Sequence, residues 1–183
     1  MSPRIRVEGY AVVSADGMLA DRTGKMPDSL KIDADAQFFT AALERAALVV
    51  HGRNSHEQQQ GSDRRRRLIL SRRIADLATH PSLPLAKLWN PAGASFAVAC
   101  RAIGVMEGMA AVTGGAEVFR LFLEIGFYAF HLSRVGKVRL PGGRPVCVAS
   151  MQPVTRTDPS AKLNQGFNRG GLKLASTVLA GRV

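Results

Sequence analysis

The sequence predicts an α/β fold in which a mostly parallel sheet is covered by helices on both faces and ends in an antiparallel C-terminal edge. Short apolar runs of strand length alternate along the chain with segments whose apolar residues recur at helical spacing. Two segments, 48–56 and 110–119, share one plan: an apolar strand, then glycine, then a helix start. This alternation indicates parallel strands, because parallel neighbours need long crossover connections.

In the first half of the chain, residues 7–13 are rich in β-branched side chains and predict a central strand that ends in a polar turn at Gly17. A helix is expected over 34–47, where Phe38, Phe39, Ala42, Leu43 and Ala46 recur at helical spacing. Buried strands are expected at 48–50 and 68–70, and residues 51–55 should turn into a short second helix.

In the second half, the apolar segments 96–100 and 110–112 are expected to be strands, whereas 80–91, with three prolines, should be irregular or edge structure with Trp89 in the core or at its rim. The most regular helical pattern combines Val118, Leu121, Phe122 and Ile125, with Gly126 as the stop. Residues 130–135 and 172–179 predict strands, with loops at 140–145 and 157–171.

Composition favours one domain over residues 1–183, because 46% apolar and 21% charged residues are ordinary for a globular chain of this length. No signal-peptide pattern and no apolar run of membrane-spanning length occurs, so we expect a cytoplasmic protein. Cys100 and Cys147 lie far apart without a C-x-x-C partner, which predicts buried thiols rather than disulfides or a cysteine zinc site.

The chain is strongly basic, with a net charge of +11, and should attract polyanions. One hypothesis is therefore a basic nucleic-acid-binding module without catalysis. The densest basic run, 64–67, has no interleaved aromatic residues, and only 6% of the chain is aromatic, so a base-stacking surface is poorly supported. Small phosphorylated ligands fit better, although a solvated basic loop explains this run equally well.

The paired strand-glycine-helix segments point to phosphate binding. The first turn of a helix offers unpaired backbone N–H groups and a partial positive charge, and glycine lets a phosphate approach that backbone closely. Two such turns in one chain suggest a dinucleotide ligand. A tight strand-to-helix turn without a ligand is the alternative.

Several segments carry a resemblance to a known family, and they occur in matching order over roughly the first four-fifths of the chain. They are ADGMLA (15–20), VHGR (50–53), LILSR (68–72), VTGGAEVF (112–119) and LPGGRP (140–145). The chain resembles the dihydrofolate-reductase-like fold, and more narrowly the reductase domain of bacterial riboflavin biosynthesis proteins. The resemblance implies a three-layer sandwich, a cytoplasmic homodimer built on the C-terminal strands, and NADPH-dependent reduction of a phosphoribosylamino-pyrimidinedione.

The resemblance also implies which residues bind NADPH. Ser71 and Arg72 match the place that holds the adenosine 2′-phosphate, and a guanidinium suits a phosphate, which favours NADPH over NADH. The residues of the two phosphate turns are Gly52, Arg53, Asn54 and Ser55 in the first and Gly114, Gly115, Ala116, Glu117 and Val118 in the second.

On the substrate side, Asp35 matches the carboxylate that assists protonation in folate reductases, and burial beside a cofactor would raise its pKa for that role. Helix capping, by Asp33 or Asp35, is an equally good explanation. Ser14 and Asp16 would lie near the substrate, or Asp16 would simply fix its own turn. Arg65, or its neighbour Arg64, is a candidate for clamping an anionic group of the substrate.

The sequence departs from the family in three respects. Met26-Pro27 is followed by Asp28 rather than tryptophan, which weakens the alternative of a dihydrofolate or pterin reductase. The sequence has no zinc-deaminase motif. Cys147 stands where the family often has phenylalanine, so the natural substrate is left open. A scaffold of this fold that has lost catalysis is also left open.

The four histidines lack partners at metal-ligand spacing, so we predict no metal.

Overall fold

The computed structural model describes residues 2–53, 61–146, 167–168 and 172–177. Its main sheet has nine strands: β1 (Arg4–Ser14), β3 (Leu48–Gly52), β4 (Arg67–Leu70), β5 (Leu77–Thr79), β6 (Ala86–Trp89), β7 (Glu107–Gly114), β8 (Ala129–Val135), β10 (Phe167–Asn168) and β11 (Leu172–Thr177). A second small sheet pairs β2 (Met18–Ala20) with β9 (Arg144–Pro145). The helices are α1 (Asp33–Arg45), α2 (Phe96–Ala102) and α3 (Ala116–Ile125), with 3-10 turns η1 (Asp28–Leu30) and η2 (Ser62–Arg64).

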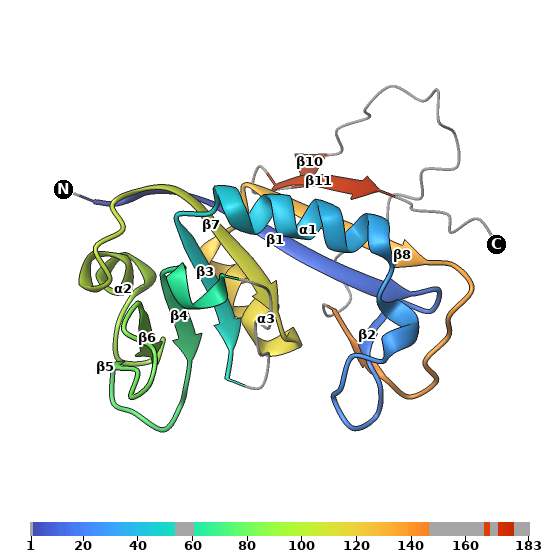
Figure 1. Ribbon diagram of the computed structural model, residues 1–183, viewed down its shortest axis with the longest axis horizontal. Coiled ribbons are helices and arrows are strands. Elements are labelled where there is room, and N and C mark those ends of the chain that lie inside the picture. The colour runs from blue at the N-terminus through green and yellow to red at the C-terminus, as the bar shows by residue number, and fades with distance from the viewer. Residues whose placement is uncertain (1, 54–60, 147–166, 169–171, 178–183) are drawn as a thin grey trace.

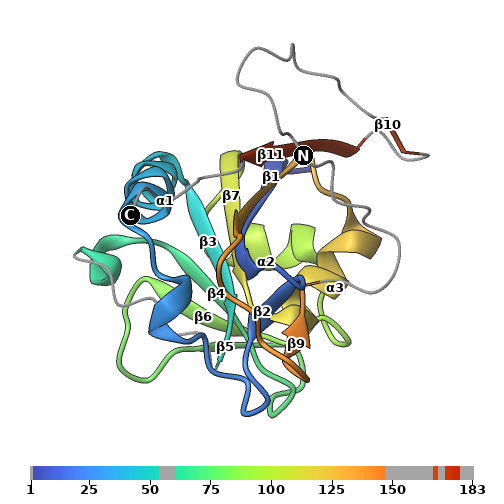
Figure 2. The ribbon, with the colours of Figure 1, turned by 90° about the vertical axis from the view of Figure 1, so that its right-hand side faces the viewer.

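The main sheet has the strand order β10-β11-β8-β1-β7-β3-β4-β6-β5. All neighbouring strands from β11 to β6 are parallel, whereas β10 is antiparallel to β11 and β5 is antiparallel to β6. Helix α1 covers one face, and α2 and α3 cover the other (Figures 1 and 2). The predicted three-layer α/β sandwich with an antiparallel C-terminal edge is therefore confirmed, and the opposite edge is antiparallel as well.

Most predicted elements form where the sequence places them, but one is wrong. Residues 96–100 belong to helix α2 instead of a strand, and Ser95 caps this helix by accepting a hydrogen bond from the Val98 N–H at 3.3 Å. Within 80–91, the residues of β6 form a regular parallel strand beside β4, so this proline-rich stretch is more ordered than expected. The predicted helix after 51–55, most of the loop 157–171 and Cys147 lie outside the described residues.

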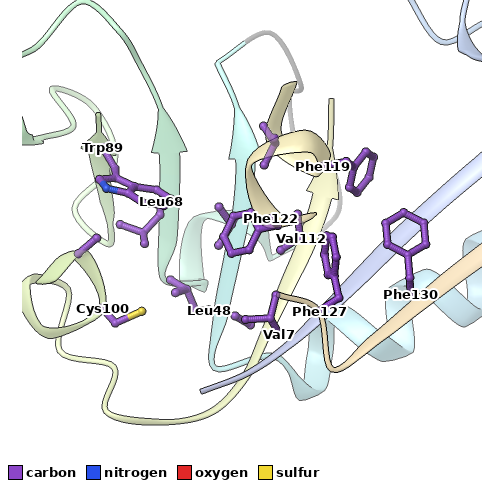
Figure 3. Packing of buried hydrophobic residues seen from close by; sticks show 14 of the residues in the cluster. Val7, Leu48, Leu68, Trp89, Cys100, Val112, Phe119, Phe122, Phe127 and Phe130 are labelled. Atoms are coloured by element: carbon purple, nitrogen blue, oxygen red, sulfur yellow. The ribbon is translucent and has the colours of Figure 1, made fainter. Parts of the chain in front are cut away.

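The larger hydrophobic core lies between the sheet and helices α2 and α3, and it is rich in aromatic residues (Figure 3). Phe122 on α3 is fully buried, and its ring contacts those of Trp89, Phe96 and Phe127. Trp89 is a core residue as expected, and its indole N–H donates to the Ala94 carbonyl at 2.7 Å. This satisfied, aromatic core fixes the position of α3, whose first turn belongs to the site described below.

The same core contains the thiol of Cys100, which is fully buried on α2. Burial raises the pKa of this thiol to about 12, because the thiolate would be desolvated. Cys100 is thus a core residue without thiolate reactivity at neutral pH.

The smaller core lies under α1, where Ala42 and Leu43 pack on the sheet against Val49, Met109 and Ala111. Phe38 and Phe39 of α1 contact the ring of Tyr10 on β1 at 6.0 and 6.2 Å between centroids. The helical spacing predicted for α1 therefore buries the expected face, except that Phe38 is 40% exposed. This layer is thinner and carries more polar groups than the opposite one.

Strand β1 joins the two halves of the sheet. Its residues Arg4 to Gly9 pair with β7, and its residues Glu8 to Ser14 pair with β8, so the two ladders overlap only at Glu8 and Gly9. A Cβ atom on Gly9 would lie 2.4 Å from the Phe130 ring, so only glycine fits where the ladders overlap.

No helix in the described part of the chain is long and apolar enough to cross a membrane.

Candidate active site

Most of the predicted site residues that the structure describes lie at one end of the sheet, where its parallel strands finish. Strands β1, β3, β4 and β7 run in the same direction, so their carboxyl ends meet at this edge. The residues found there are Ser14 and Asp16 after β1, Gly52 and Arg53 after β3, Ser71 and Arg72 after β4, and the turn of Gly114, Gly115, Ala116, Glu117 and Val118 after β7. Asn54 and Ser55 lie outside the described residues.

The two strand-glycine-helix turns lie side by side. The end of β3 pairs with the end of β7, and a Cβ atom built on Gly52 would lie 3.7 Å from the Gly115 nitrogen and 3.4 Å from a Val118 methyl. Gly114 has φ +111° and packs against the Phe119 ring, a conformation that a side chain would strain. The Gly114–Gly115 peptide bond is cis. The two neighbouring glycine turns therefore offer one continuous stretch of backbone rather than two separate anion sites.

Helix α3 begins at this surface. Gly115 is the N-cap residue and has no side chain to cap the first turn, so the first amides of α3 keep the unpaired N–H groups that helix geometry leaves at an N-terminus. The tight fit of Val118 and Phe119 into the large core holds the helix axis in place. The partial positive charge of this terminus is thereby directed at the carboxyl edge of the sheet.

Ser71 and Arg72 follow β4 and border the same surface. Ser71 is buried, and its hydroxyl accepts a hydrogen bond from the Arg73 N–H at 3.4 Å. Arg72 extends to the first turn of α3, where its Nη2 lies 3.0 Å from Glu117 Oε2. Arg120, one turn further along α3, contacts the same carboxylate oxygen. The segment after β4 is thus connected to the second glycine turn by charged side chains.

The loop after β1 is held by its own side chains. The Ser14 hydroxyl, fully buried, donates to the Asp16 carboxylate at 2.5 Å, and the Leu140 N–H donates to the same carboxylate at 3.1 Å. These two hydrogen bonds lower the pKa of Asp16. Arg134 on β8 donates to the Ala15 carbonyl at 2.7 Å. Of the two roles expected for Asp16, fixing its own turn is the one with partners in the structure.

Asp35 lies in the first turn of α1, facing the end of β8. Burial raises the pKa of its carboxyl group, and a hydrogen bond with Ser133 on β8 partly offsets this rise. The N-cap residue of α1 is Ile32, and it makes no side-chain capping bond. Asp33 is exposed in the same turn, so a second carboxylate is available to interact with the N-terminus of α1. Asp35 is therefore the carboxyl of this pair that is turned toward the sheet and is easier to protonate than an exposed aspartate.

Arg65 lies away from the glycine turns. It follows η2 and precedes β4, so it belongs to the amino end of this strand, whereas Ser71 and Arg72 follow its carboxyl end. Within the same basic run, Arg64 and Arg66 are exposed, but Arg67 is buried at the first position of β4. The run is therefore not a uniform solvated loop, and Arg65 could meet only a group that extends along the sheet from the glycine turns.

A buried polar cluster under α1 has no counterpart in the sequence-based site. Glu8 on β1 accepts hydrogen bonds from the Tyr10 hydroxyl at 2.6 Å and from His131 Nε2 at 3.3 Å, and Arg6 lies 2.8 Å from its other oxygen. Although burial opposes ionisation, the hydrogen bonds from Tyr10 and His131 and the charge of Arg6 together lower the pKa of Glu8. The alternation of Glu8 and Tyr10 on one strand places both on one face, but nothing in the sequence pairs them with His131.

The described residues form a hollow away from the predicted site and offer no cluster of metal ligands. Among the described residues no group of three or more histidine, cysteine, aspartate or glutamate side chains is placed to hold a metal ion. A hollow of about 590 Å³ lies near the start of β1, lined in part by Arg4, Phe96, Ile125 and Tyr128, and by none of the predicted site residues.

The fold and the arrangement of this edge place the chain in one class, the three-layer α/β sandwiches with a mostly parallel central sheet. No protein-family model matches the sequence, and no curated protein matches it. Solved structures that share this fold include three described as riboflavin biosynthesis or pyrimidine reductase proteins. A putative riboflavin biosynthesis protein from Shewanella sp. PV-4 is 20% identical with a TM-score of 0.58, covering 84% of this chain and 86% of that one.

The second is a diaminohydroxyphosphoribosylaminopyrimidine deaminase/5-amino-6-(5-phosphoribosylamino)uracil reductase from Thermotoga maritima, 17% identical with a TM-score of 0.56. The match covers 91% of this chain but 54% of that bifunctional one. The third is a pyrimidine reductase-like protein from Corynebacterium diphtheriae, 16% identical with a TM-score of 0.50, covering 79% of each chain. At these identities the likeness establishes the fold.

Proposed function

We propose that this chain is an NADPH-dependent reductase of a nitrogen heterocycle, most like a 5-amino-6-(5-phosphoribosylamino)uracil reductase. The observation that carries the proposal is that the two glycine turns are neighbours: His51 pairs with Gly114, and a Cβ atom built on Gly52 would lie 3.7 Å from the Gly115 nitrogen. A dinucleotide has two phosphates in one bridge, and a continuous backbone surface with a helix N-terminus suits them. Structures with this fold include proteins described as pyrimidine and phosphoribosylaminouracil reductases.

The residues present fit NADPH. Gly52 and Gly115 are partly exposed where the bridging phosphates would lie, Gly114 is buried behind them, and Arg53 is exposed beside them. Arg72, at the rim of the same surface, offers the planar guanidinium that suits a phosphate monoester such as the adenosine 2′-phosphate. A substrate would then lie between the Ser14–Asp16 loop and the start of α1.

When bound, the nicotinamide supplies a hydride, and the reduced heterocycle must gain a proton. Asp35 is the proposed proton source, directly or through a water molecule. Its raised pKa keeps a fraction of the carboxyl protonated closer to neutral pH than for an exposed aspartate, and Ser133 orients the group. Asp16, held by Ser14 and Leu140, would shape the loop against the substrate rather than transfer protons.

Titration of the purified protein with NADPH and NADH tests the cofactor. Fluorescence transfer to the nicotinamide and a rise in melting temperature report binding, and a ligand at about 100 times its Kd adds roughly 2.7 kcal/mol to the free energy of unfolding. Arg72→Ala should weaken NADPH binding more than NADH binding. Absence of both signals with millimolar NADPH would exclude the reductase.

Turnover separates the remaining possibilities. We expect NADPH oxidation with a phosphoribosylamino-pyrimidinedione and little with dihydrofolate, because Asp28 follows Met26-Pro27. Cofactor binding without turnover on either class would indicate a scaffold that has lost catalysis. Nucleic-acid binding that NADPH does not displace, with a steep salt dependence, would favour the basic binding module instead.

A homodimer built on the C-terminal strands is also proposed, from the family resemblance. Strand β10 forms one edge of the described sheet, and an edge strand has backbone groups available for pairing. Light scattering coupled to gel filtration would give the mass of the assembly. A monomer at micromolar concentration would contradict the dimer without affecting the cofactor proposal.

A further inference from the structure

Two arginines converge on one carboxylate at the proposed cofactor surface. Nη2 of Arg72 lies 3.0 Å from Oε2 of Glu117, and Nη2 of Arg120 contacts the same oxygen. Arg72 and Glu117 are 45 residues apart in the sequence, so the fold brings them together. The arrangement is a two-guanidinium anion site whose occupant is a side chain of the same protein.

The place of this cluster determines which ligand would meet it. Glu117 stands in the first turn of α3, next to the Gly115–Ala116 backbone of the second glycine turn. Arg72 follows β4 directly, beside Ser71. A dinucleotide lying along the glycine turns would therefore bring its adenosine end to Arg72, and any phosphate on that end would approach the Glu117 carboxylate.

The Glu117 carboxylate is held weakly and can be exchanged. Side-chain exposure is 80% for Arg72, 61% for Glu117 and 54% for Arg120, so water screens every pair in the cluster. A phosphate monoester carries more charge than a carboxylate and three acceptor oxygens in place of two. It would outcompete Glu117 for both guanidinium groups, and the freed carboxylate can turn into solvent.

We propose that the Glu117 side chain is an internal competitor for the 2′-phosphate of NADPH and that Arg120 is a second guanidinium for that phosphate. The inference rests on the proposed function and extends it to cofactor specificity. The backbone of Glu117 belongs to the phosphate turn, whereas its side chain opposes phosphate binding. Glu117 therefore reduces the difference in affinity between NADPH and NADH that Arg72 and Arg120 would otherwise produce.

The first test replaces the competing charge. Glu117→Gln should tighten NADPH binding about two- to fivefold, the range that one exposed charge pair provides, and should change NADH binding less. Glu124→Gln is the matched control, because Glu124 is an exposed glutamate on the same helix, seven residues further from the glycine turn. It removes the same charge from the protein without freeing Arg72. Dissociation constants for both cofactors come from fluorescence titration at one ionic strength.

The second test removes the proposed partner. Arg120→Gln should weaken NADPH binding about two- to fivefold with a smaller effect on NADH. The ligand pair 2′,5′-ADP and 5′-AMP repeats the comparison without the nicotinamide half, so the change can be assigned to the 2′-phosphate.

The outcomes distinguish this inference from the function on which it rests. No NADPH binding by the wild-type protein overturns both. Wild-type NADPH binding together with equal effects of Glu117→Gln on the two cofactors, or an effect matching that of Glu124→Gln, overturns the competitor role alone. Weaker NADPH binding by Glu117→Gln would make the side chain a ligand for the cofactor and also overturns it.

Discussion

The two faces of the sheet are built differently. The face under α2 and α3 is an aromatic core in which Phe119, Phe122 and Phe130 are almost completely buried. The face under α1 has a smaller apolar cluster and, beside it, the ionisable groups Glu8, Tyr10, His131 and Asp35. The aromatic face stabilises the fold and so keeps the glycine turns in position. The α1 face buries polar groups, which costs desolvation free energy, at the place where a reaction would need them.

The sharpest difference on the α1 face is between two of its carboxyl groups. Glu8 has a lowered pKa because it accepts hydrogen bonds and faces Arg6, whereas Asp35 has a raised pKa because burial outweighs its bond with Ser133. Glu8 is an ionised structural group. Asp35 is a carboxyl that the fold makes easier to protonate, which is what a proton donor needs.

The largest effect is expected on the aromatic face. Phe122→Ala should lower the free energy of unfolding by about 3–5 kcal/mol, because the ring is fully buried among Trp89, Phe96 and Phe127. Phe38→Ala, the corresponding change on the α1 face, should cost about 1–2 kcal/mol since that ring is 40% exposed. Urea denaturation of both variants measures the difference. Equal losses would show that the two faces contribute alike.

The second effect concerns activity. Asp35→Asn should reduce kcat of the proposed reductase about 100-fold or more, since the amide cannot supply a proton. Asp33→Asn is the control, because Asp33 lies exposed in the same turn of α1. Steady-state assays with NADPH in excess compare the variants. If Asp35→Asn and Asp33→Asn both retain wild-type kcat, the two aspartates serve the helix N-terminus and Asp35 is not the proton source.

The third effect concerns the Glu8 cluster. Glu8→Gln should lower the free energy of unfolding by about 1–2 kcal/mol at pH 7 through the loss of charged hydrogen bonds. Because the folded protein lowers the pKa of Glu8, its ionised form stabilises the fold at pH values above the unfolded pKa, and this stabilisation is lost as the pH falls through the folded pKa. The gap to wild type should therefore shrink in acid. Glu44→Gln, an exposed change on α1, should show no such pH dependence.

The smallest effect has the opposite sign. The raised pKa of Asp35 means that its ionised form is disfavoured in the folded protein. Relative to Asp35→Asn, the wild type should thus lose stability as the pH rises from below the unfolded pKa to above the folded one. Denaturation of the two proteins at pH 3.5 and pH 7 gives this difference directly. A gap that changes in the same direction as for Glu8→Gln would contradict the contrast between the two carboxyl groups.

The elements that the sequence predicts best are those with a long periodic pattern. Helix α3 begins and ends close to the predicted positions, because its apolar residues keep the helical period up to Gly126. Helix α2 was expected as a strand, because its apolar run is too short for periodicity to distinguish the two. The useful signal was Ser95, a residue type that favours N-caps, directly before the run.

The candidate site likewise has features that the sequence predicts and features that it does not. The glycine turns are identifiable because each is a local pattern at a strand end, whereas Ser71 and Arg72 after β4 are indicated by the family resemblance. Contacts between distant segments are not identifiable, since Arg72 with Glu117, Asp35 with Ser133 and Glu8 with His131 depend on strand order. No spacing in one sequence encodes that order. The strand order sets both the burial that raises the pKa of Asp35 and the hydrogen bonds that lower the pKa of Glu8.

The position of β1 between β7 and β8 has a consequence for the order in which the protein can assemble during synthesis. This central strand ends at Ser14, but its first partner begins at Glu107 and its second at Ala129. A chain emerging from the ribosome therefore carries its middle strand with both edges unpaired until most of the domain has been made. Such distant pairing slows folding, and a nascent chain that stops before β7 should expose the strand to chaperones or to other chains.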